Sequence, residues 1–449
     1  MDWLGRAKLE FHASSTPISF ETQDGATKTL VDIAREATPA CQLNPLLFNG
    51  HLQTCYTAVM KDAPDVHYKR RIFEAEHSGY SGSFAVDFYV PPESAGAEKD
   101  ESLPPRTTYF SEEELAGLGS DDERPMLVVL HGLSGGSHEV YLRHAIAPLL
   151  ESGKWEACVV NSRGCAKSKI TTGILYNARA TWDTRQVVKW LRKTYPNRPL
   201  FGLGFSLGAC ILTNYLGEEG SNCQLKAAVA CANPWNLELS SNALKRTFIG
   251  HNLYSRVLGT AMKKLAETHK TEIEKFTDLD LEKISKLTFL YEFDREVQCA
   301  AWGYPTENAY YRDASSVDSV MAIRIPYLAI NSTDDPVSLP PMVHNEYCGG
   351  VANGSSSGDQ ISSSEALPIG EIKTNPYTVM CTTSLGGHLG WFEFGGGRWH
   401  SAPVANFMNY MAFEAKLGST KLKANGTGSK YHAGAEFDPM RRKMVVPLE

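Results

Sequence analysis

Residues 200–208 read LFGLGFSLG, an apolar run that ends in the pentapeptide Gly-Phe-Ser-Leu-Gly. The run over 200–205 predicts a buried strand, and the spacing over 207–216 predicts a helix directly after it. A serine at so sharp a strand-to-helix turn has a strained backbone, and the turn pushes its hydroxyl out of the sheet. The flanking glycines are needed because side chains there would collide with neighbouring elements. The segment therefore predicts that Ser206 is a nucleophile; the alternative is a glycine-rich turn with a solvent-facing serine.

Strands and helices alternate on both sides of this turn. The expected strands are 126–130, 156–160, 200–205, 226–231, 326–330 and 377–382, and the expected helices are 138–150, 184–193, 207–216 and 404–415. Strands that alternate with helices are joined by crossover connections, so neighbouring strands run parallel and helices cover both faces of the sheet. The expected fold class is therefore α/β with a mostly parallel sheet, of which 377–382 is expected to be the last strand.

The composition along the chain divides it into five parts. We expect an irregular, partly helical extension over 1–66, the first part of the α/β core over 67–235, a helical and charged segment over 236–319, the second part of the core over 320–417, and a tail over 418–449. Residues 71–90 alternate around a Gly-Tyr-Ser-Gly turn and predict a hairpin of two strands. Two surface segments are also expected: 91–124, with ten acids against three bases, and the Gly/Ser-rich loop 349–365.

The overall composition excludes several classes of protein. The 449 residues are 42% hydrophobic and 21% charged, which is typical of a globular protein with a sizeable core. The net charge of -7 gives no basic surplus for a nucleic acid. No run reaches the ~18 apolar residues of a transmembrane helix, and the N-terminal residues lead us to expect no secretory signal. With ten cysteines and no CxxC pair, we expect reduced thiols and a cytoplasmic location, or one at the surface of a lipid droplet or membrane.

A second glycine-rich turn, HGLSGG at residues 131–136, follows the expected strand 126–130. Its glycines let the backbone approach a substrate and turn an amide, that of Leu133, toward it. The amide of Leu207 begins a helix, where the helix dipole favours a negative charge. Leu133 and Leu207 are therefore the expected donors of an oxyanion hole, and a plain turn at 131–136 is the alternative. No GK[ST] motif follows, which excludes a phosphate-binding loop.

An activated serine needs a base and a carboxylate that orients it, in the chain order Ser, Asp, His for such a fold. Asp334 and Asp335 both follow the expected strand 326–330, at the end of a parallel strand where sites of this kind are built. Asp335 is favoured because the adjacent Pro336 stiffens the turn, and Asp334 is expected to bind loop amides.

The base expected is His388, in the glycine-bounded loop SLGGHLG at 384–390 after the last expected strand. His400 is the rival, but no strand precedes it directly. The histidines and cysteines show no metal-binding spacing, and there is no dinucleotide fingerprint. We therefore expect a reaction without metal or cofactor.

Several blocks of the sequence together resemble the α/β-hydrolase superfamily. They are NPLLFNGHLQT at 44–54, NSRGC at 161–165 with Tyr176 and Asp183 after it, YYRDASS at 310–316, and the Asp334-Asp335-Pro336 turn. Within the superfamily they resemble the branch of YheT-like bacterial esterases, mammalian α/β-hydrolase-domain lipases, and fungal medium-chain fatty-acid ethyl ester synthase/esterases and monoacylglycerol lipases. The resemblance covers about 44–410, and the segments 91–124 and 349–365 depart from it.

This resemblance implies a serine esterase or lipase that forms an acyl-enzyme on medium-chain acyl esters, such as monoacylglycerols or fatty-acid ethyl esters. Carried over by motif, Ser206, Asp335 and His388 would be nucleophile, acid and base, and 236–319 would be a helical cap. One alternative is an acyl-CoA:alcohol acyltransferase that forms ethyl esters, and another is a non-catalytic binding protein of the same fold. The 44–54 block has no expected catalytic role, and His51 within it is expected to be structural.

Overall fold

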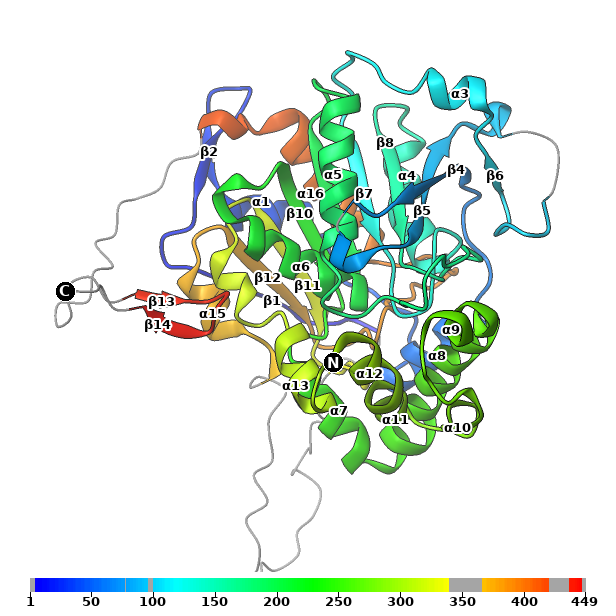
Figure 1. Ribbon diagram of the computed structural model, residues 1–449. Helices are drawn as coiled ribbons and strands as arrows, with labels where there is room; N and C mark the ends of the chain where they lie inside the picture. The colour runs from blue at the N-terminus through cyan, green and yellow to red at the C-terminus, as the bar shows by residue number, and fades with distance from the viewer. Residues whose placement is uncertain (1–4, 77, 96–99, 339–365, 420–435, 446–449) are drawn as a thin grey trace, which may run out of the picture.

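The computed structural model describes residues 5–76, 78–95, 100–338, 366–419 and 436–445. Its centre is a ten-stranded sheet (Figure 1). In spatial order the strands are β1 (Leu9–Ala13), β12 (Thr378–Thr383), β11 (Tyr327–Ser332), β10 (Leu225–Cys231), β9 (Leu200–Phe205), β7 (Met126–Leu130), β8 (Glu156–Asn161), β5 (Ser83–Val90), β4 (His67–Glu74) and β6 (Thr107–Tyr109). The strands from β12 to β8 in this order run parallel, so the expected α/β fold with a mostly parallel sheet is confirmed.

Side chains of the central strands alternate between two apolar layers. Along β7, Leu127 and Val129 pack on one side with α1 (Leu30–Ala37), α4 (Val140–Leu150) and α16 (Ser401–Asn409). Val128 packs on the other side with α5 (Trp182–Thr194), α6 (Leu207–Glu219) and α15 (Ile369–Thr374). A strand that is buried on both faces reads as a continuous apolar run, which is why these strands were predictable.

The expectation of an irregular extension over 1–66 is wrong for the strand β1. This strand pairs antiparallel with β12 at the edge of the main sheet, and Leu9, Phe11 and Ala13 pack against the core. Their alternation has the period of a strand, but it spans only five residues and is half-exposed. Two short strands, β2 (Ser19–Glu21) and β3 (Thr27–Thr29), and the helix α2 (Gly50–Val59) complete the region.

The hairpin expected over 71–90 is confirmed, because β4 and β5 pair antiparallel along their whole length. The acidic segment that follows contains α3 (Glu112–Ala116) and also contributes β6, which pairs with β4.

The expectation that 377–382 is the last strand is wrong, since β13 (Glu436–Asp438) and β14 (Lys443–Val445) form a further hairpin. The loop 349–365 lies outside the described residues.

A group of helices lies between β10 and β11 in the sequence and gathers in the lower part of Figure 1. It comprises α7 (Leu237–Arg246), the π-helix η5 (Gly250–Ser255), α8 (Arg256–Thr268), α9 (Lys270–Phe276), α10 (Leu281–Ser285), α11 (Leu290–Phe293), the π-helix η6 (Asp294–Gln298), α12 (Cys299–Trp302) and α13 (Glu307–Ala314). Met262, Phe293 and Val297 of these helices form a separate apolar cluster with Ile170 and Leu175. In the described part of the chain, no helix combines the length and apolar character needed to cross a bilayer.

Candidate active site

Ser206 stands between β9 and α6 with φ 50° and ψ -120°, a backbone conformation that a non-glycine residue adopts only under constraint. The neighbouring glycines explain the constraint. A Cβ on Gly204 would lie 2.7 Å from the Cα of Ala209, and one on Gly208 would lie 2.4 Å from the carbonyl oxygen of Leu130. The turn therefore has no room for side chains on either side of the serine.

Three side chains that are far apart in the sequence meet at this turn. The Oγ of Ser206 lies 2.7 Å from Nε2 of His388, and Nδ1 of His388 lies 2.7 Å from Oδ2 of Asp335. The Asp335 carboxyl is fully buried, and its Oδ1 accepts the backbone N–H groups of Val337 at 2.8 Å and Ser338 at 3.0 Å. These donors fix the carboxyl so that Oδ2 faces the imidazole. A carboxylate at Nδ1 favours the tautomer with its proton there, which leaves Nε2 free to accept a proton from the serine.

Asp334 lies against the loop that carries His388 rather than against the imidazole ring. Its Oδ1 accepts the N–H of Gly387 at 2.9 Å and the hydroxyl of Ser332. Burial raises the pKa of Asp334 to about 6, and the nearby charge of Asp335 acts in the same direction. Of the two adjacent acids, Asp335 is thus the one in contact with His388.

The two amides expected to hold an oxyanion, those of Leu133 and Leu207, are available for a ligand. Within the described residues, neither N–H has a hydrogen-bond acceptor. The amides on both sides of Leu133 are occupied, because Gly132 donates to the hydroxyl of Tyr141 at 2.8 Å and Ser134 donates to that of Tyr176 at 2.6 Å. The tyrosines therefore fix the turn on both sides of one free N–H.

Neither supporting hydroxyl was indicated as functional by the sequence. Tyr141 lies within a helix that reads as an ordinary core element, and Tyr176 was noted only as part of a motif. Both are buried, and a buried tyrosine hydroxyl needs a hydrogen-bond partner. The sequence could therefore predict that each hydroxyl has a hydrogen-bond partner, but not that this partner is the glycine-rich turn.

The 44–54 block ends in the first turns of α2, which packs directly on the loop of His388. The N–H of His388 donates to Oγ1 of Thr54 at 2.8 Å, and Thr54 in turn donates to the carbonyl oxygen of Gly50 at 2.6 Å. A Cβ on Gly387 would lie 2.4 Å from that same carbonyl oxygen. The block thus contacts the residue expected to be the base, although the sequence suggested no role for it.

Two other residues of the quoted motifs have structural contacts. His51 stacks on Tyr254 of η5, and its Nδ1 lies 2.8 Å from the tyrosine hydroxyl, which connects α2 with the helical segment. Arg163 of the NSRGC block is buried and donates to both oxygens of Asp183, at 2.9 and 2.8 Å. Neither side chain lines the cavity beside Ser206.

A buried polar network supports the C-terminal end of the glycine-rich turn 131–136. The Asp87 carboxylate accepts two hydrogen bonds from the Arg70 guanidinium, at 2.6 and 2.8 Å. It also accepts the Ser137 hydroxyl at 2.6 Å and the Asn161 amide at 2.8 Å. Such a network rigidifies its surroundings because every member is satisfied. It joins β4, β5 and β8 to the end of the turn that carries Leu133.

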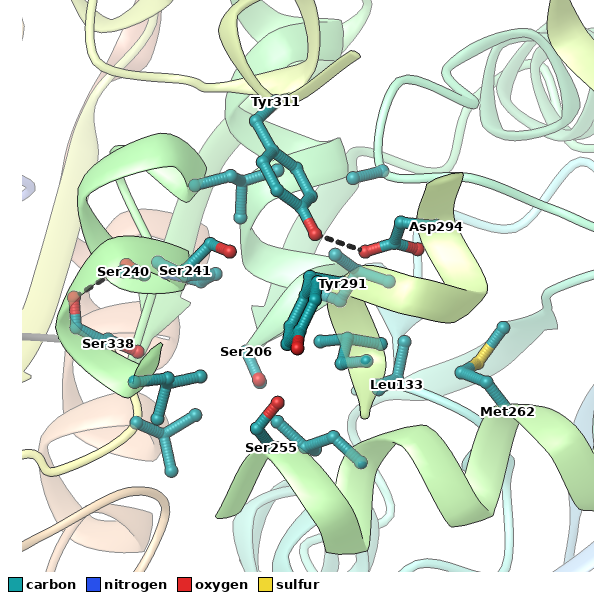
Figure 2. A pocket seen from close by; sticks show the side chains of 18 of the residues that line it. Leu133, Ser206, Ser240, Ser241, Ser255, Met262, Tyr291, Asp294, Tyr311 and Ser338 are labelled. Atoms are coloured by element: carbon teal, nitrogen blue, oxygen red, sulfur yellow. Dashed lines mark hydrogen bonds between the residues drawn. The ribbon is translucent and has the colours of Figure 1, made fainter. Parts of the chain in front are cut away.

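Ser206 and His388 line a common cavity, which Figure 2 shows from close by. Its apolar lining includes Leu133, Leu207, Leu237, Leu244, Leu258, Met262 and Leu290. Its polar lining includes Ser240, Ser241, Ser255, Asp294, Gln298 and Tyr311. One wall follows the carboxyl ends of the strands, and the opposite wall is formed by α7, α8, α11, η6 and α13.

The rival histidine, His400, lies elsewhere. It is fully buried and stacks on Trp391, and burial lowers its pKa to about 3. Among the described residues, no group of three or more His, Cys, Asp or Glu side chains is arranged to hold a metal ion. The nine cysteines of these ranges are all unpaired.

Comparison with known proteins identifies similar sequences over most of the chain. A family model described as alpha/beta hydrolase fold matches residues 125–350. The chain is 36% identical over 407 residues to a monoacylglycerol lipase of Saccharomyces cerevisiae, covering 86% of this chain and 81% of that one. It is 32% identical over 408 residues to medium-chain fatty acid ethyl ester synthase/esterase 2 of the same yeast, covering 82% and 84%. It is 31% identical over 270 residues to phospholipase ABHD3 of Homo sapiens, covering 60% and 59%.

Proposed function

Because the chain belongs to the α/β hydrolase fold family, we propose that it is a serine carboxylic-ester hydrolase acting on medium-chain acyl esters such as monoacylglycerols or fatty-acid ethyl esters. The observation that carries the proposal is the pair of 2.7 Å contacts that links Ser206 to His388 and His388 to Asp335. These contacts lie beside a largely apolar cavity, where an ester with a hydrocarbon chain would be desolvated.

In the proposed reaction, His388 Nε2 takes the Ser206 proton while Oγ attacks the ester carbonyl carbon. The amides of Leu133 and Leu207 donate to the oxyanion that forms, and Asp335 stabilises the imidazolium. Collapse breaks the bond to the alkoxy oxygen, which receives the proton from His388 and departs as the alcohol. Water then attacks the acyl-enzyme in the same way and releases the fatty acid.

The choice of substrate rests on two kinds of support. Leucine side chains from α7, α8 and α11 form an apolar surface that suits an acyl chain. Two relatives at 36% and 32% identity are named as a monoacylglycerol lipase and a medium-chain fatty acid ethyl ester synthase/esterase. Ester hydrolysis is the reaction common to both names.

The test is the loss of the hydroxyl in Ser206→Ala, with turnover of p-nitrophenyl octanoate and labelling by a fluorophosphonate probe as readouts. We expect loss of both, with an unchanged thermal midpoint. Ser285→Ala is the matched control, since this exposed serine only donates to the carbonyl oxygen of Glu282. Turnover that survives in Ser206→Ala, or a wild-type protein that the probe does not label, would reject the proposal.

Acyl transfer to an alcohol is a second candidate, favoured by the synthase/esterase name of the relative at 32% identity. Both reactions would share the acyl-enzyme and differ in whether water or an alcohol attacks it. Incubation with octanoyl-CoA in aqueous ethanol distinguishes them. Ethyl octanoate in excess over octanoate would favour the transferase, and octanoate in excess would favour the hydrolase.

We further propose a cytoplasmic enzyme that contacts lipid surfaces peripherally, because its substrates partition into them. Exposed apolar side chains next to the cavity-lining helices support this location, namely Phe248, Ile249, Leu253 and Val257. Co-sedimentation with liposomes tests it: Phe248→Asp combined with Val257→Asp should weaken binding while turnover of a water-soluble ester is kept.

A further inference from the structure

One wall of the cavity carries a carboxyl group that the proposed reaction does not use. Asp294 begins the π-helix η6, and Tyr311 on α13 donates its hydroxyl to Asp294 Oδ2 at 2.7 Å. Figure 2 shows the two side chains turned toward one another. Ser241 of α7 lines the cavity as well. All three residues line the same cavity as Ser206, so this polar group faces the substrate space.

The Asp294 carboxyl is an unusual group for a hydrocarbon-binding cavity. Only 6% of the residue is exposed, and within the described ranges no Lys or Arg forms a salt bridge with it. Burial raises its pKa to about 7, which reflects the cost of a charge at this site. Oδ2 has its partner in Tyr311, whereas Oδ1 accepts no hydrogen bond from the described residues. Because Asp294 lines the cavity, Oδ1 can accept a hydrogen bond from a bound ligand.

A hydrocarbon chain is a poor occupant for this wall, because it offers no donor to Oδ1. A free hydroxyl is a suitable one, since its O–H donates to a carboxyl oxygen and its oxygen accepts from a phenol or serine. The alcohol part of a monoacylglycerol carries two free hydroxyls, and the alcohol part of a simple alkyl ester carries none.

We propose that Asp294 and Tyr311 form a subsite that binds the free hydroxyls of the glycerol part of a monoacylglycerol. The subsite selects such esters over esters of plain alcohols. This inference rests on the proposed ester hydrolase function and names the alcohol that the same site prefers. Asp294 and Tyr311 act in recognition, and neither takes part in the acyl transfer itself.

The decisive experiment compares three octanoyl esters whose alcohols share a three-carbon skeleton: propyl octanoate, 2-hydroxypropyl octanoate and 1-monooctanoylglycerol. In the ester these alcohols carry zero, one and two free hydroxyls, while the acyl part and the three-carbon skeleton stay constant. For the wild type we expect kcat/KM to rise along the series by at least about tenfold, because a site built for a hydroxyl discriminates against its absence.

Replacing the carboxyl should abolish this preference. In Asp294→Leu, kcat/KM for 1-monooctanoylglycerol should fall about 10- to 100-fold, and that for propyl octanoate should stay within about threefold of wild type. Tyr311→Phe should show the same selective loss to a smaller degree. If the leucine variant does not fold, Tyr311→Phe carries the test. Asp294→Asn keeps a polar group of the same shape and should keep most of the preference.

The control Leu244→Ala alters an apolar part of the same cavity and should change all three esters in parallel. A ratio between the glycerol and propyl esters that is equal in wild type, Asp294→Leu and Tyr311→Phe would overturn the inference while hydrolysis itself stands. Absence of hydrolysis of all three esters by the wild type, together with absence of fluorophosphonate labelling, would instead reject the proposed function.

Discussion

The backbone N–H of His388 donates to the hydroxyl oxygen of Thr54 at 2.8 Å, across 334 residues of chain. Because the Thr54 hydroxyl donates its proton to the Gly50 carbonyl, its oxygen acts as the acceptor for the N–H of His388. Thr54 lies on α2, so the first of these bonds fixes the imidazole-bearing loop to a helix from the N-terminal region. The Asp335 carboxyl holds the ring of His388, and Thr54 holds its backbone.

Thr54→Val tests this positioning role. Valine has nearly the same shape as threonine but offers no acceptor, so the N–H of His388 loses its partner. We expect kcat for an octanoyl ester to fall about tenfold with KM nearly unchanged, because displacing the proposed base His388 affects the chemical step rather than binding.

The control is Thr54→Ser, which restores the hydroxyl and should recover most of kcat. A purely structural role would instead lower the thermal midpoint of both variants without separating kcat from KM. Equal kcat values in Thr54→Val and the wild type would contradict the positioning role.

The two adjacent acids should differ sharply in their effect on activity. In Asp335→Asn the amide N–H group would face Nδ1 of His388 and favour the tautomer that cannot accept the Ser206 proton, so kcat should fall about 10³- to 10⁴-fold. Asp334→Asn should cost less than about tenfold, because Asp334 contacts the loop amide and not the ring. Parallel kinetics on p-nitrophenyl octanoate measure the contrast. A larger loss in the Asp334 variant would reverse the assignment.

Much of the fold was predictable because the local pattern and the tertiary environment agree. The central strands are buried on both faces, so their apolar runs identify them without knowledge of their partners. The turn around Ser206 was equally predictable from the sequence. Gly204 and Gly208 have no room for a side chain, because elements adjacent in the sequence or in the sheet lie too close to them. Chain order then limited the candidate acid and base to very few residues.

The remaining contacts depend on long-range packing that leaves no local pattern. Thr54 is an unremarkable position in a helix until α2 is placed on the His388 loop. The strand β1 is too short and too exposed to stand out, and only its pairing with β12 defines it. Asp294 reads as one more charge in a charged helical segment, because its burial depends on η6 packing against α13.

Gly208→Ala should test the close packing of the serine turn. Its Cβ would lie 2.4 Å from the carbonyl oxygens of both Leu130 and His131. These are backbone atoms, and they cannot move without displacing the glycine-rich turn at 131–136, which carries the proposed oxyanion donor Leu133. We expect a lower thermal midpoint and at least about a 100-fold loss of kcat, since the amides at the turn would shift away from the reacting carbonyl. A matched control is Gly370→Ala in α15, where a Cβ meets no atom within 4 Å and alanine favours a helix. Wild-type activity in Gly208→Ala would show that the packing is more tolerant than these distances imply.

The raised pKa of Asp334 predicts how the stability of the protein responds to pH. Burial and the nearby Asp335 raise the pKa from 3.8 to about 6, so the folded state binds this proton more tightly than the unfolded state does. The stabilisation from the protonated form is fully present below pH 3.8 and is lost as the pH rises through 6. The side chain in Asp334→Asn does not titrate. As the pH rises from 4.5 to 7.5, the free energy of unfolding of the variant minus that of the wild type should therefore increase by about 2 kcal/mol.

Urea unfolding of both proteins at several pH values measures this difference, and the sign is the decisive part. Asn keeps an oxygen that can accept the N–H of Gly387, so the comparison isolates the charge from the hydrogen bond. If the free energy of unfolding of the wild type instead rose relative to that of the variant as the pH rises, the folded protein would favour the Asp334 carboxylate. The loop of His388 would then be stabilised by that charge, whereas burial, with the nearby charge of Asp335, predicts that the charge opposes it.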